Sequence, residues 1–340
     1  MRVYEINNSD ASWKLDKPEM TISNPHVTGN GNQQVLVRFY VEASVPASAV
    51  KLTESEKESI TIVDYYDSEI VIPFNEYNDY GWKSSRVRDD RYNYFSPSFL
   101  NESPESNNIN AGGERFDFYI SCNDANASPL KIAVKITGDN GKVFITNGDS
   151  YGPSGEPIAT NYKLSLTPEI TVHTPVYYDA SRFFLSAPVG IAATRNSSPH
   201  AAIFNHGIYL SLSPDGSRQL ALRELVAEPS GMIHWQTPDV DDRTPCFIGF
   251  ANPGETNIGW HPDKTKVPTG NQPLPKLTAG DVNHDKCLII MCGRNDIRQG
   301  DYPSNFDGPC SLRVTDVHGT PHNLKLSFIP RKRDEIILSN

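Results

Sequence analysis

Hydrophobic and polar residues alternate along many short segments of this chain. In residues 35–41 (VLVRFYV) every second position is apolar, and residues 116–122 (FDFYISC) follow the same rule. Because successive side chains of an extended strand point to opposite faces, this alternation predicts strands that bury one face. Further strands are expected at residues 59–63, 69–72, 130–136, 142–146, 162–166, 207–211, 288–292, 311–317, 323–328 and 335–338.

Turn-forming residues separate the predicted strands, and helical signals are scarce. The sequence TGDNG at residues 137–141 lies between two predicted strands and favours a β-hairpin. Thr53 and Glu56 have the spacing of a capping box, which predicts one or two helical turns at most. Residues 217–226 fit either a helix or a strand. The 26 prolines and 23 glycines interrupt the chain too often for long helices, so the sequence predicts an all-β fold.

The chain is long enough for two domains of ordinary size, and its two halves end in a similar way. In each half, a strand with a cysteine precedes two strands that a glycine-containing turn joins. This repeat predicts two tandem β-sandwich domains with long loops, covering residues 1–168 and 169–340. In the alternative interpretation, the segment 147–160, rich in Gly, Ser and Pro, is the linker between the domains.

Residues 30–39 (NGNQQVLVRF) resemble the early strand of bacterial immunoglobulin-like domains of the invasin and intimin type. In those domains an Asn-Gly turn opens an alternating apolar strand. The resemblance covers only a small part of the first predicted domain. It implies two immunoglobulin-like sandwiches. It also implies structural or adhesive work, as spacers or binding tips of exported surface proteins.

Charge and hydropathy exclude several classes of partner. The 31 basic and 41 acidic residues give a net charge of −10, which disfavours binding to nucleic acid or anionic membranes. The apolar runs are too short for a membrane span, so membrane insertion is not expected. The first 20 residues lack the apolar core of a signal peptide. This favours a cytoplasmic protein, or one exported without an N-terminal signal.

Five cysteines are spread over the chain, and an odd number is not typical of a disulfide framework. Cys287 and Cys292 are expected on one strand, where a spacing of five residues points them to opposite faces. They are therefore too far apart to form a disulfide with each other. We interpret all five cysteines as small buried hydrophobic residues, with a disulfide from Cys310 as the alternative.

The segment 281–285 has the spacing of a calcium-binding loop. Asp281, Asn283 and Asp285 match the first three ligands, but Lys286 replaces the turn glycine and Cys292 replaces the bidentate glutamate. A polar turn before the next strand is the preferred interpretation. A second acidic cluster, interpreted in the same way, contains Asp239, Asp241 and Asp242.

Eight of the nine histidines lie from residue 173 onward, which raises the question of a metal or catalytic site. His318 and His322 flank a predicted turn, but a zinc site there would need ligands from His284 or the nearby cysteines. The chain contains no established nucleophile, metalloprotease or phosphate-binding motif and no cofactor signature. An enzyme of hydrolase type in the second domain remains an alternative hypothesis.

The most unusual composition lies at residues 64–99, where ten aromatic residues are interleaved with three arginines, Asp and Asn. Tyr, Trp and Arg are typical of binding hot spots, and flat aromatic faces also suit sugar rings. The predicted ligand-binding residues are Tyr77, Tyr80, Trp82, Arg86, Arg88, Tyr92 and Tyr94. In the alternative interpretation, half of these aromatic residues form the core. Trp235 and Trp260, each beside a histidine, could line a second pocket or belong to the core.

The leading hypothesis is a non-enzymatic structural or recognition protein without a cofactor. It would bind a protein or glycan partner through its aromatic-rich loops. A second hypothesis is the enzyme named above. A third is a connector or accessory subunit of a larger secreted assembly or toxin. The oligomeric state distinguishes the first hypothesis from the third.

Overall fold

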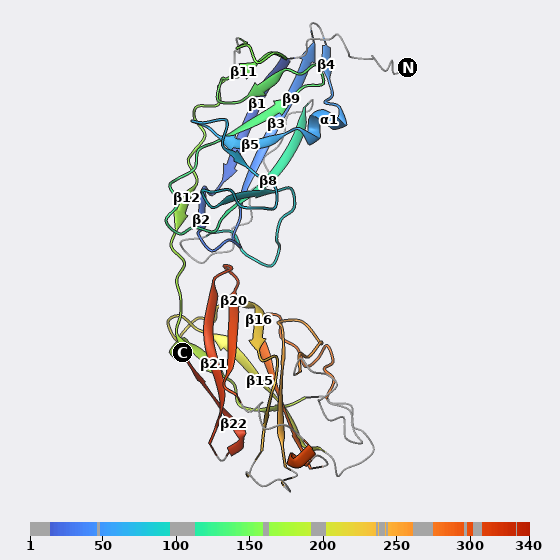
Figure 1. Cartoon of the computed structure of the whole chain (residues 1–340), viewed down its shortest axis with the longest axis vertical. Coiled ribbons are helices and arrows are strands. Elements are labelled where there is room, and N and C mark those ends of the chain that lie inside the picture. The colour runs from blue at the N-terminus through green and yellow to red at the C-terminus, as the bar shows by residue number, and fades with distance from the viewer. Residues whose placement is uncertain are drawn as a thin grey trace, which may run out of the picture. The chain divides into compact units, whose positions relative to one another are not determined.

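A computed structural model describes residues 14–45, 48–95, 113–158, 163–191, 202–235, 237, 242, 244–260, 275–295, 298–301, 308–330 and 332–340. The chain divides into two compact units, unit 1 (Met1–Pro175) and unit 2 (Val176–Asn340). Strands make up nearly all the regular structure of both units, which confirms the all-β prediction. Figure 1 shows the strands of each unit.

Unit 1 contains two main sheets. The first has the order β1-β3-β8-β7, with β4 pairing beside β3. Its strands are β1 (Lys14–Ser23), β3 (Val35–Val45), β4 (Ser48–Val50), β7 (Trp82–Ser85) and β8 (Glu114–Cys122). The second has the order β11-β10-β9-β5-β6. Its strands are β5 (Thr61–Asp64), β6 (Val71–Ile72), β9 (Ile132–Thr137), β10 (Val143–Ile145) and β11 (Ser150–Tyr151). Separately, β2 (His26–Thr28) pairs in parallel with β12 (Thr171–His173).

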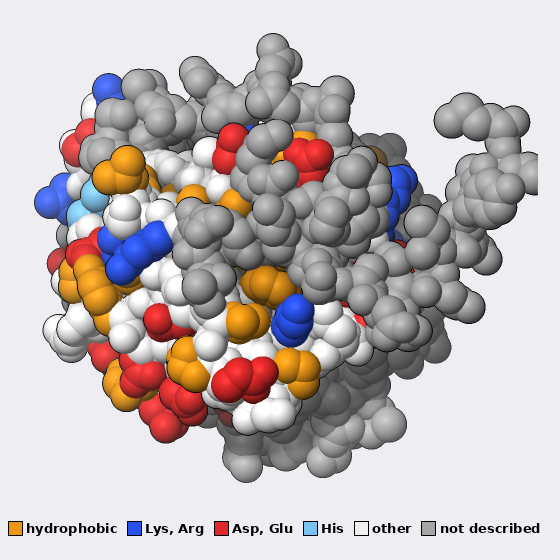
Figure 2. Space-filling view, turned by 90° about the horizontal axis from the view of Figure 1, so that it is seen from above, with side chains coloured by type: hydrophobic (Ala, Val, Ile, Leu, Met, Phe, Trp, Pro, Cys, Tyr) orange, Lys and Arg blue, Asp and Glu red, His pale blue; other side chains and the backbone are white. Residues whose placement is uncertain are grey.

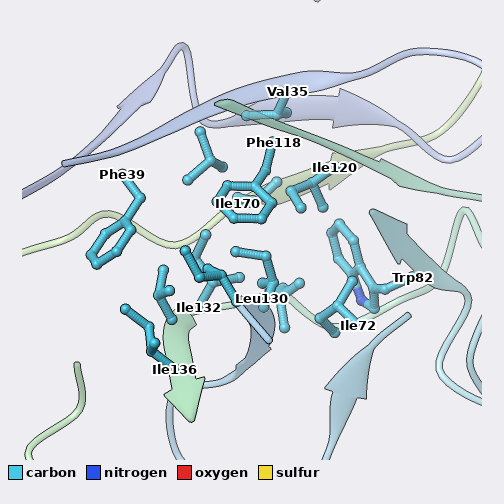
Figure 3. Packing of buried hydrophobic residues seen from close by; sticks show 14 of the residues in the cluster. Val35, Phe39, Ile72, Trp82, Phe118, Ile120, Leu130, Ile132, Ile136 and Ile170 are labelled. Carbon is cyan, nitrogen blue, oxygen red and sulfur yellow. The ribbon is translucent and has the colours of Figure 1, made fainter. Parts of the chain in front are cut away.

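The alternating segments of unit 1 bury the face that the sequence predicts. On β3, Val35, Val37, Phe39 and Val41 are at most 1% exposed. They form one hydrophobic cluster with β8 and with the apolar face of β9 in the other sheet, so the two sheets share a core (Figure 3). Each fully buried side chain of this kind contributes about 1.5–3 kcal/mol to folding.

Two local predictions in unit 1 are confirmed. Strands β9 and β10 form a hairpin, in which Thr137 pairs with Val143 and Gly141 takes a φ of +78° in the turn. The helix α1 (Glu54–Glu58) starts with a capping box. Thr53 accepts a hydrogen bond from the Glu56 backbone N–H, and the Glu56 carboxylate accepts one from the Thr53 backbone N–H.

Unit 2 also contains two sheets. The first has the order β13-β15-β19-β18-β17, with β14 beside β15, and the second has the order β16-β20-β21-β22. The strands of the first are β13 (Phe183–Leu185), β14 (Val189–Gly190), β15 (Ala202–Leu212), β17 (Met232–His234), β18 (Cys246–Ala251) and β19 (Cys287–Arg294). Those of the second are β16 (Leu222–Glu228), β20 (Cys310–Asp316), β21 (Pro321–Ile329) and β22 (Lys332–Ser339). Two 3-10 helices are η1 (Ala180–Arg182) and η2 (Gln299–Asp301).

The two units share an order of strand pairing. The strands β1, β3, β8 and β7 lie side by side in unit 1, and β13, β15, β19 and β18 lie side by side in unit 2. In both sets the third strand of the sheet comes later in the chain than the fourth. The three strands β10-β9-β5 correspond in the same way to β21-β20-β16. All these pairs are antiparallel. Each unit therefore repeats one arrangement of seven strands, although the loops between them differ.

Some strand predictions differ from the structure. Of the predicted strand 162–166, residue 162 lies outside the described part, and residues 163–166 form a turn instead of a strand. The Leu164 backbone N–H donates a hydrogen bond to the Thr146 carbonyl, at 2.8 Å, but no ladder follows. The ambiguous segment 217–226 ends in strand β16.

All five cysteines are free and buried, which confirms their interpretation as hydrophobic residues. Cys287 and Cys310 lie in the main core of unit 2, whereas Cys292 packs on the other face of β19. Burial raises the pKa of the Cys287 thiol well above its usual range and that of Cys310 to about 12. The two thiols are therefore protonated and unreactive at neutral pH.

The described residues include no helix of the length and hydropathy that a membrane span requires. On the face of the molecule in Figure 2, acidic, basic and hydrophobic side chains lie interspersed.

Candidate functional site

The aromatic-rich segment divides between the core and the surface of unit 1. Trp82 and Tyr92 are only 3% and 4% exposed, and the Trp82 ring points into the hydrophobic core (Figure 3). The core position of Trp82 follows from its place on β7, where it pairs with Cys122. Neither side chain is therefore available to a ligand on the surface. Residues 96–99 of this segment lie outside the described part of the chain.

Tyr77 and Tyr80 lie on the connection between β6 and β7. The Tyr77 hydroxyl donates a hydrogen bond of 2.6 Å to the Gly31 carbonyl, and the Lys83 ammonium lies 4.5 Å from the centre of its ring. Tyr80 is 60% exposed, and its backbone N–H donates a hydrogen bond to the Asn78 side-chain oxygen. Tyr77 thus fixes the turn before β3, while Tyr80 presents its ring to solvent.

Arg86 packs against the edge of the core. Its guanidinium lies 4.0 Å from the centre of the Phe118 ring and donates a hydrogen bond of 3.1 Å to the Ile60 carbonyl. Burial lowers the pKa of this guanidinium below its usual value, but Arg remains charged. Arg86 therefore connects β8 to the end of α1 and holds the start of the following loop.

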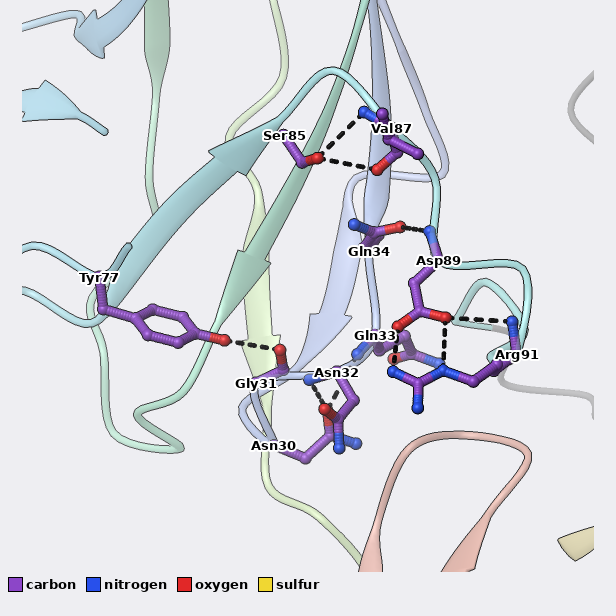
Figure 4. A network of polar contacts seen from close by, with 10 residues as sticks. All are labelled: Asn30, Gly31, Asn32, Gln33, Gln34, Tyr77, Ser85, Val87, Asp89 and Arg91. Atoms are coloured by element: carbon purple, nitrogen blue, oxygen red, sulfur yellow. Dashed lines mark hydrogen bonds and ion pairs between the residues drawn. The ribbon is translucent and has the colours of Figure 1, made fainter. Parts of the chain in front are cut away.

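The residues that follow, 87–95, form a loop anchored by two glutamines of the turn before β3 (Figure 4). The Gln34 side-chain oxygen accepts the Asp89 backbone N–H at 2.7 Å, and the Gln33 amide donates to the Asn93 carbonyl at 3.1 Å. Gln33 is 1% exposed, and its oxygen accepts hydrogen bonds from the backbone N–H and the hydroxyl of Thr28. The 87–95 loop is thus held by hydrogen bonds to the buried Gln33 and the partly buried Gln34.

Arg88 and Tyr94 form a cation–π pair on the 87–95 loop. The Arg88 guanidinium carbon lies 4.4 Å from the centre of the Tyr94 ring, within the range of a cation–π contact. Arg88 Nε also pairs with Asp90 Oδ1 at 3.2 Å, and the Asp90 side chain is 85% exposed. Burial raises the pKa of Tyr94, and the nearby charges of Arg88 and Arg38 partly oppose this rise. Two arginines therefore lie near one half-buried phenol.

A second arginine of this loop is engaged within the loop. Arg91 donates to both carboxylate oxygens of Asp89, at 2.9 Å and 2.7 Å. This bidentate pair lowers the pKa of the Asp89 carboxyl. Arg91 also lies over the buried Tyr92 ring, 5.1 Å from its centre. Arg91 thus forms a bidentate ion pair within the loop, whereas Arg88 forms a single contact with Asp90.

The end of the 87–95 loop contacts two histidines. His26 Nδ1 and His173 Nε2 are 3.1 Å apart, and the Phe95 ring stacks on His173 at 4.3 Å between centres. The Asn24 side chain also donates a hydrogen bond to the Phe95 carbonyl. Burial and the neighbouring His26 lower the pKa of His173. This group joins the loop to the parallel pair of β2 and β12.

The calcium-like segment forms a polar turn, as the preferred interpretation predicts. The Asp281 carboxylate accepts the Thr278 backbone N–H and hydroxyl, at 2.8 Å and 2.7 Å. Asp285 pairs with Arg223 at 3.0 Å. Among the residues that the structure describes, no group of three or more His, Cys, Asp or Glu could hold a metal. Asp239 and Asp241 lie outside those residues, and the Asp242 carboxylate accepts the Thr244 hydroxyl and backbone N–H.

His322 is the buried histidine of unit 2 that meets a carboxylate. It is 1% exposed, its Nε2 lies 3.1 Å from Asp316 Oδ2, and its Nδ1 accepts the Tyr178 backbone N–H. Both ring nitrogens are thus engaged within the protein, so the imidazole presents no free nitrogen to a substrate. Burial lowers the pKa of the neighbouring His318. These contacts fix the β20–β21 turn to the segment before η1.

The tryptophans of the two predicted Trp-His pairs pack in one cluster of unit 2. Trp235 and Trp260 pack against Ile233, Phe247 and Cys292 on the face of β17, β18 and β19 that points away from the main core. They are partly buried in this cluster. His234 stacks on Phe328, with 4.7 Å between ring centres. Residue 261 lies outside the described part of the chain. The described side chains of these pairs therefore serve packing.

Comparison with known proteins finds no relative: no family model matches the chain, and no curated protein matches it.

Sequence reasoning missed the anchors of the candidate site. Gln33 and Gln34 fall in the segment that carries the immunoglobulin-like resemblance. Their hydrogen-bond partners, Asn93 and Asp89, lie about 60 positions further along the chain, so the sequence does not show that they meet. The available signal was two adjacent amide side chains directly before a strongly apolar strand. Such side chains are buried only when they satisfy hydrogen bonds.

Proposed function

We propose that the protein is a non-enzymatic recognition protein built from two tandem immunoglobulin-like β-sandwiches, which binds a glycan through unit 1. The binding surface would consist of the exposed parts of the 87–95 loop, with Arg88 and Tyr94, and of the β6–β7 connection with Tyr80. The buried residues Trp82 and Tyr92 would support this surface from below.

The order of strands supports the immunoglobulin-like part of the proposal. Immunoglobulin constant-type domains pair their strands as A-B-E-D in one sheet and C-F-G in the other. The chain order of β1-β3-β8-β7 and β5-β9-β10 follows this scheme, with β1 as strand A and β10 as strand G. The corresponding strands of unit 2 follow it as well. The resemblance of residues 30–39 to invasin-type and intimin-type domains falls on the turn before strand B.

The anchoring of the 87–95 loop is the observation that carries the recognition part. A loop fixed by Gln33, Gln34 and Arg86 loses little conformational freedom when a ligand binds, which favours affinity. Its tip nevertheless presents an Arg-Tyr pair in cation–π contact and an exposed carboxylate, Asp90. Rigid placement of functional side chains on a surface loop is typical of binding proteins.

The charge of the loop favours a glycan over a protein partner. Five of the six residues 86–91 are charged. The centres of protein interfaces are depleted in Asp, Glu and Lys although Arg is enriched there, so Asp89 and Asp90 are the residues that disfavour a protein partner. Planar carboxylate and guanidinium groups suit the hydroxyl groups of sugars. Tyr80, 60% exposed, adds a flat apolar face for a sugar ring.

The enzyme hypothesis receives no support from the described histidines and cysteines. His322 uses both ring nitrogens inside the protein, and Cys287 and Cys310 are protonated in the core. A hydrolase would need a nucleophile or base within hydrogen-bond reach of a substrate.

A glycan array with structure-based variants tests the proposal. We expect the protein to be retained on a subset of glycans, and Tyr80→Ala and Arg88→Ala to reduce retention without changing the melting temperature. Val226→Ala, at a position 53% exposed on unit 2, is the matched control and should bind as the wild type does. Retention on no glycan, or retention that neither unit 1 variant changes, would contradict the proposal.

A further inference from the structure

We infer that the Arg88–Tyr94 pair is a receptor for a carboxylate group, so that the ligand is an acidic glycan whose sugar carries a carboxylate. This inference rests on the proposed function and names the ligand class for the same surface.

The position of Arg88 leaves donors for such a ligand. A cation–π contact attracts the guanidinium charge to the ring face and uses none of its N–H donors. The contact with Tyr94, 4.4 Å from the guanidinium carbon to the ring centre, thus positions Arg88 without using its donors. The Arg88 side chain is 34% exposed, so part of it is accessible from solvent.

Asp90 occupies the position of the ligand's carboxylate in the free protein. One of its oxygens meets Arg88 Nε at 3.2 Å, which is a single contact and not the bidentate pair of strong Arg–carboxylate recognition. Its side chain is 85% exposed, so little holds it in place. A surface ion pair of this kind contributes little, and an incoming carboxylate can displace it.

The contrast with Arg91, three residues away, makes the assignment specific. Arg91 already holds Asp89 through two hydrogen bonds, and this pair belongs to the loop itself. Replacing that internal partner would cost both bonds, whereas replacing Asp90 costs one weak contact. Of the two arginines in the loop, Arg88 is therefore the one with donors to offer.

The surroundings favour a negative charge at this place, although the whole chain carries −10. Arg38 and Arg88 both act electrostatically on Tyr94. Asp89 feels the positive charges of Arg91 and Lys83. Attraction by several positive groups extends over roughly a Debye length, about 8–10 Å at physiological salt. Asp90 also acts on Tyr94, so two positive groups remain near this ring once an incoming carboxylate has displaced Asp90.

The test uses matched sugars that differ only in charge. Oligogalacturonides and sialyllactose, each compared with its own methyl ester, are presented to the intact protein by biolayer interferometry. We expect binding to the acidic member of a pair and weaker binding at higher salt. Arg88→Gln should weaken binding about tenfold or more, because it removes hydrogen bonds to a charged group. Asp90→Asn should strengthen binding several-fold, because it removes the competing carboxylate.

A control variant removes the same charge elsewhere. Arg313→Gln lies on an exposed position of β20 in unit 2 and should bind within about twofold of the wild type. Equal binding to an acid and its ester, or unchanged binding by Arg88→Gln, would overturn the inference. If neutral sugars bind and Tyr80→Ala abolishes this binding, the proposed glycan recognition stands and the carboxylate assignment fails. If neither acidic nor neutral sugars bind, both fail.

Discussion

The first sheets of the two units have the same strand order but different outer faces. In unit 1, the outward residues of β8 are polar or aromatic, and Asp117 and Tyr119 remain partly exposed. In unit 2, all eight residues of the corresponding strand β19 are buried. Leu288 and Ile290 pack there with Ala251 and Leu277 in a second hydrophobic cluster. The same arrangement of strands thus has a polar outer face in unit 1 and a buried apolar outer face in unit 2.

This difference separates what determines the fold from what is available for function. The inner faces of both units are apolar, since β3 and β15 each place alternate residues in a main core. The outer faces are not required for closing that core, so they can change character without changing the strand order. Unit 1 uses this freedom for the 87–95 loop. Unit 2 adds a second apolar layer.

The largest expected effect concerns Trp82, which separates core from surface within the aromatic-rich segment. Trp82→Ala should destabilise unit 1 by about 3–5 kcal/mol, because it empties a large volume in the core. Differential scanning calorimetry should show a lowered transition for unit 1 and an unchanged one for unit 2. Tyr80→Ala, at an exposed ring, should leave both transitions in place. Equal effects of the two substitutions would contradict the division made above.

The second prediction tests the outer faces directly. Ile290→Ala on β19 should cost about 2–5 kcal/mol, because Ile290 is completely buried in the apolar layer of unit 2. Asp117→Ala on β8, which loses only its ion pair with Arg115, should cost about 1 kcal/mol or less. Chemical denaturation of both variants measures the difference. A small cost for Ile290→Ala would show that the second layer is not a true core.

A third, smaller effect concerns the hydrogen bonds that hold the 87–95 loop. Gln33→Leu should destabilise unit 1 by about 1–3 kcal/mol, because the buried Thr28 N–H and hydroxyl lose their acceptor. Amide hydrogen exchange should also speed up in residues 87–95. Gln34→Leu, which loses one bond to Asp89, should affect the loop more than the overall stability. Unchanged exchange in both variants would mean that the glutamines do not anchor the loop.

The sequence predicted the inner faces better than the outer ones. Alternation in residues 35–41 identified the buried side of β3, and the capping box at Thr53 and Glu56 identified α1. Both depend on local spacing, which a chain displays directly. The burial of Trp82 could not be read in this way, because an aromatic residue suits a core and a binding surface equally well.

Contacts between distant residues were the second obstacle. The partners of Gln33 and Gln34 lie about 60 residues further along the chain, so no local pattern connects them. The parallel pairing of β2 with β12 joins residues about 145 positions apart, and both strands are only three residues long. Short strands carry too few alternations to be recognised.

The smallest expected effect is a dependence of stability on pH, which compares the histidines of the two units. The pKa of His173 in unit 1 lies below its usual value, because of burial and of His26 at 3.1 Å. An unfolded histidine has a pKa of about 6.5, so at lower pH the unfolded chain binds more protons than the folded one. Folded stability should therefore be unaffected above about pH 6.5 and decrease as the pH falls through the folded pKa of His173.

His318 in unit 2 should contribute with the same sign, because burial lowers its pKa as well. His173→Gln should therefore flatten the decrease in melting temperature between pH 7 and pH 5 for unit 1 alone, and His318→Gln for unit 2 alone. Carboxylates titrate at lower pH in the variant and in the wild type alike. The difference between their melting temperatures therefore reports the contribution of the replaced histidine. If His173→Gln leaves the pH profile of unit 1 unchanged, protonation of His173 does not oppose folding. The contact between β12 and β2 would then depend on its backbone pairing and not on the two rings.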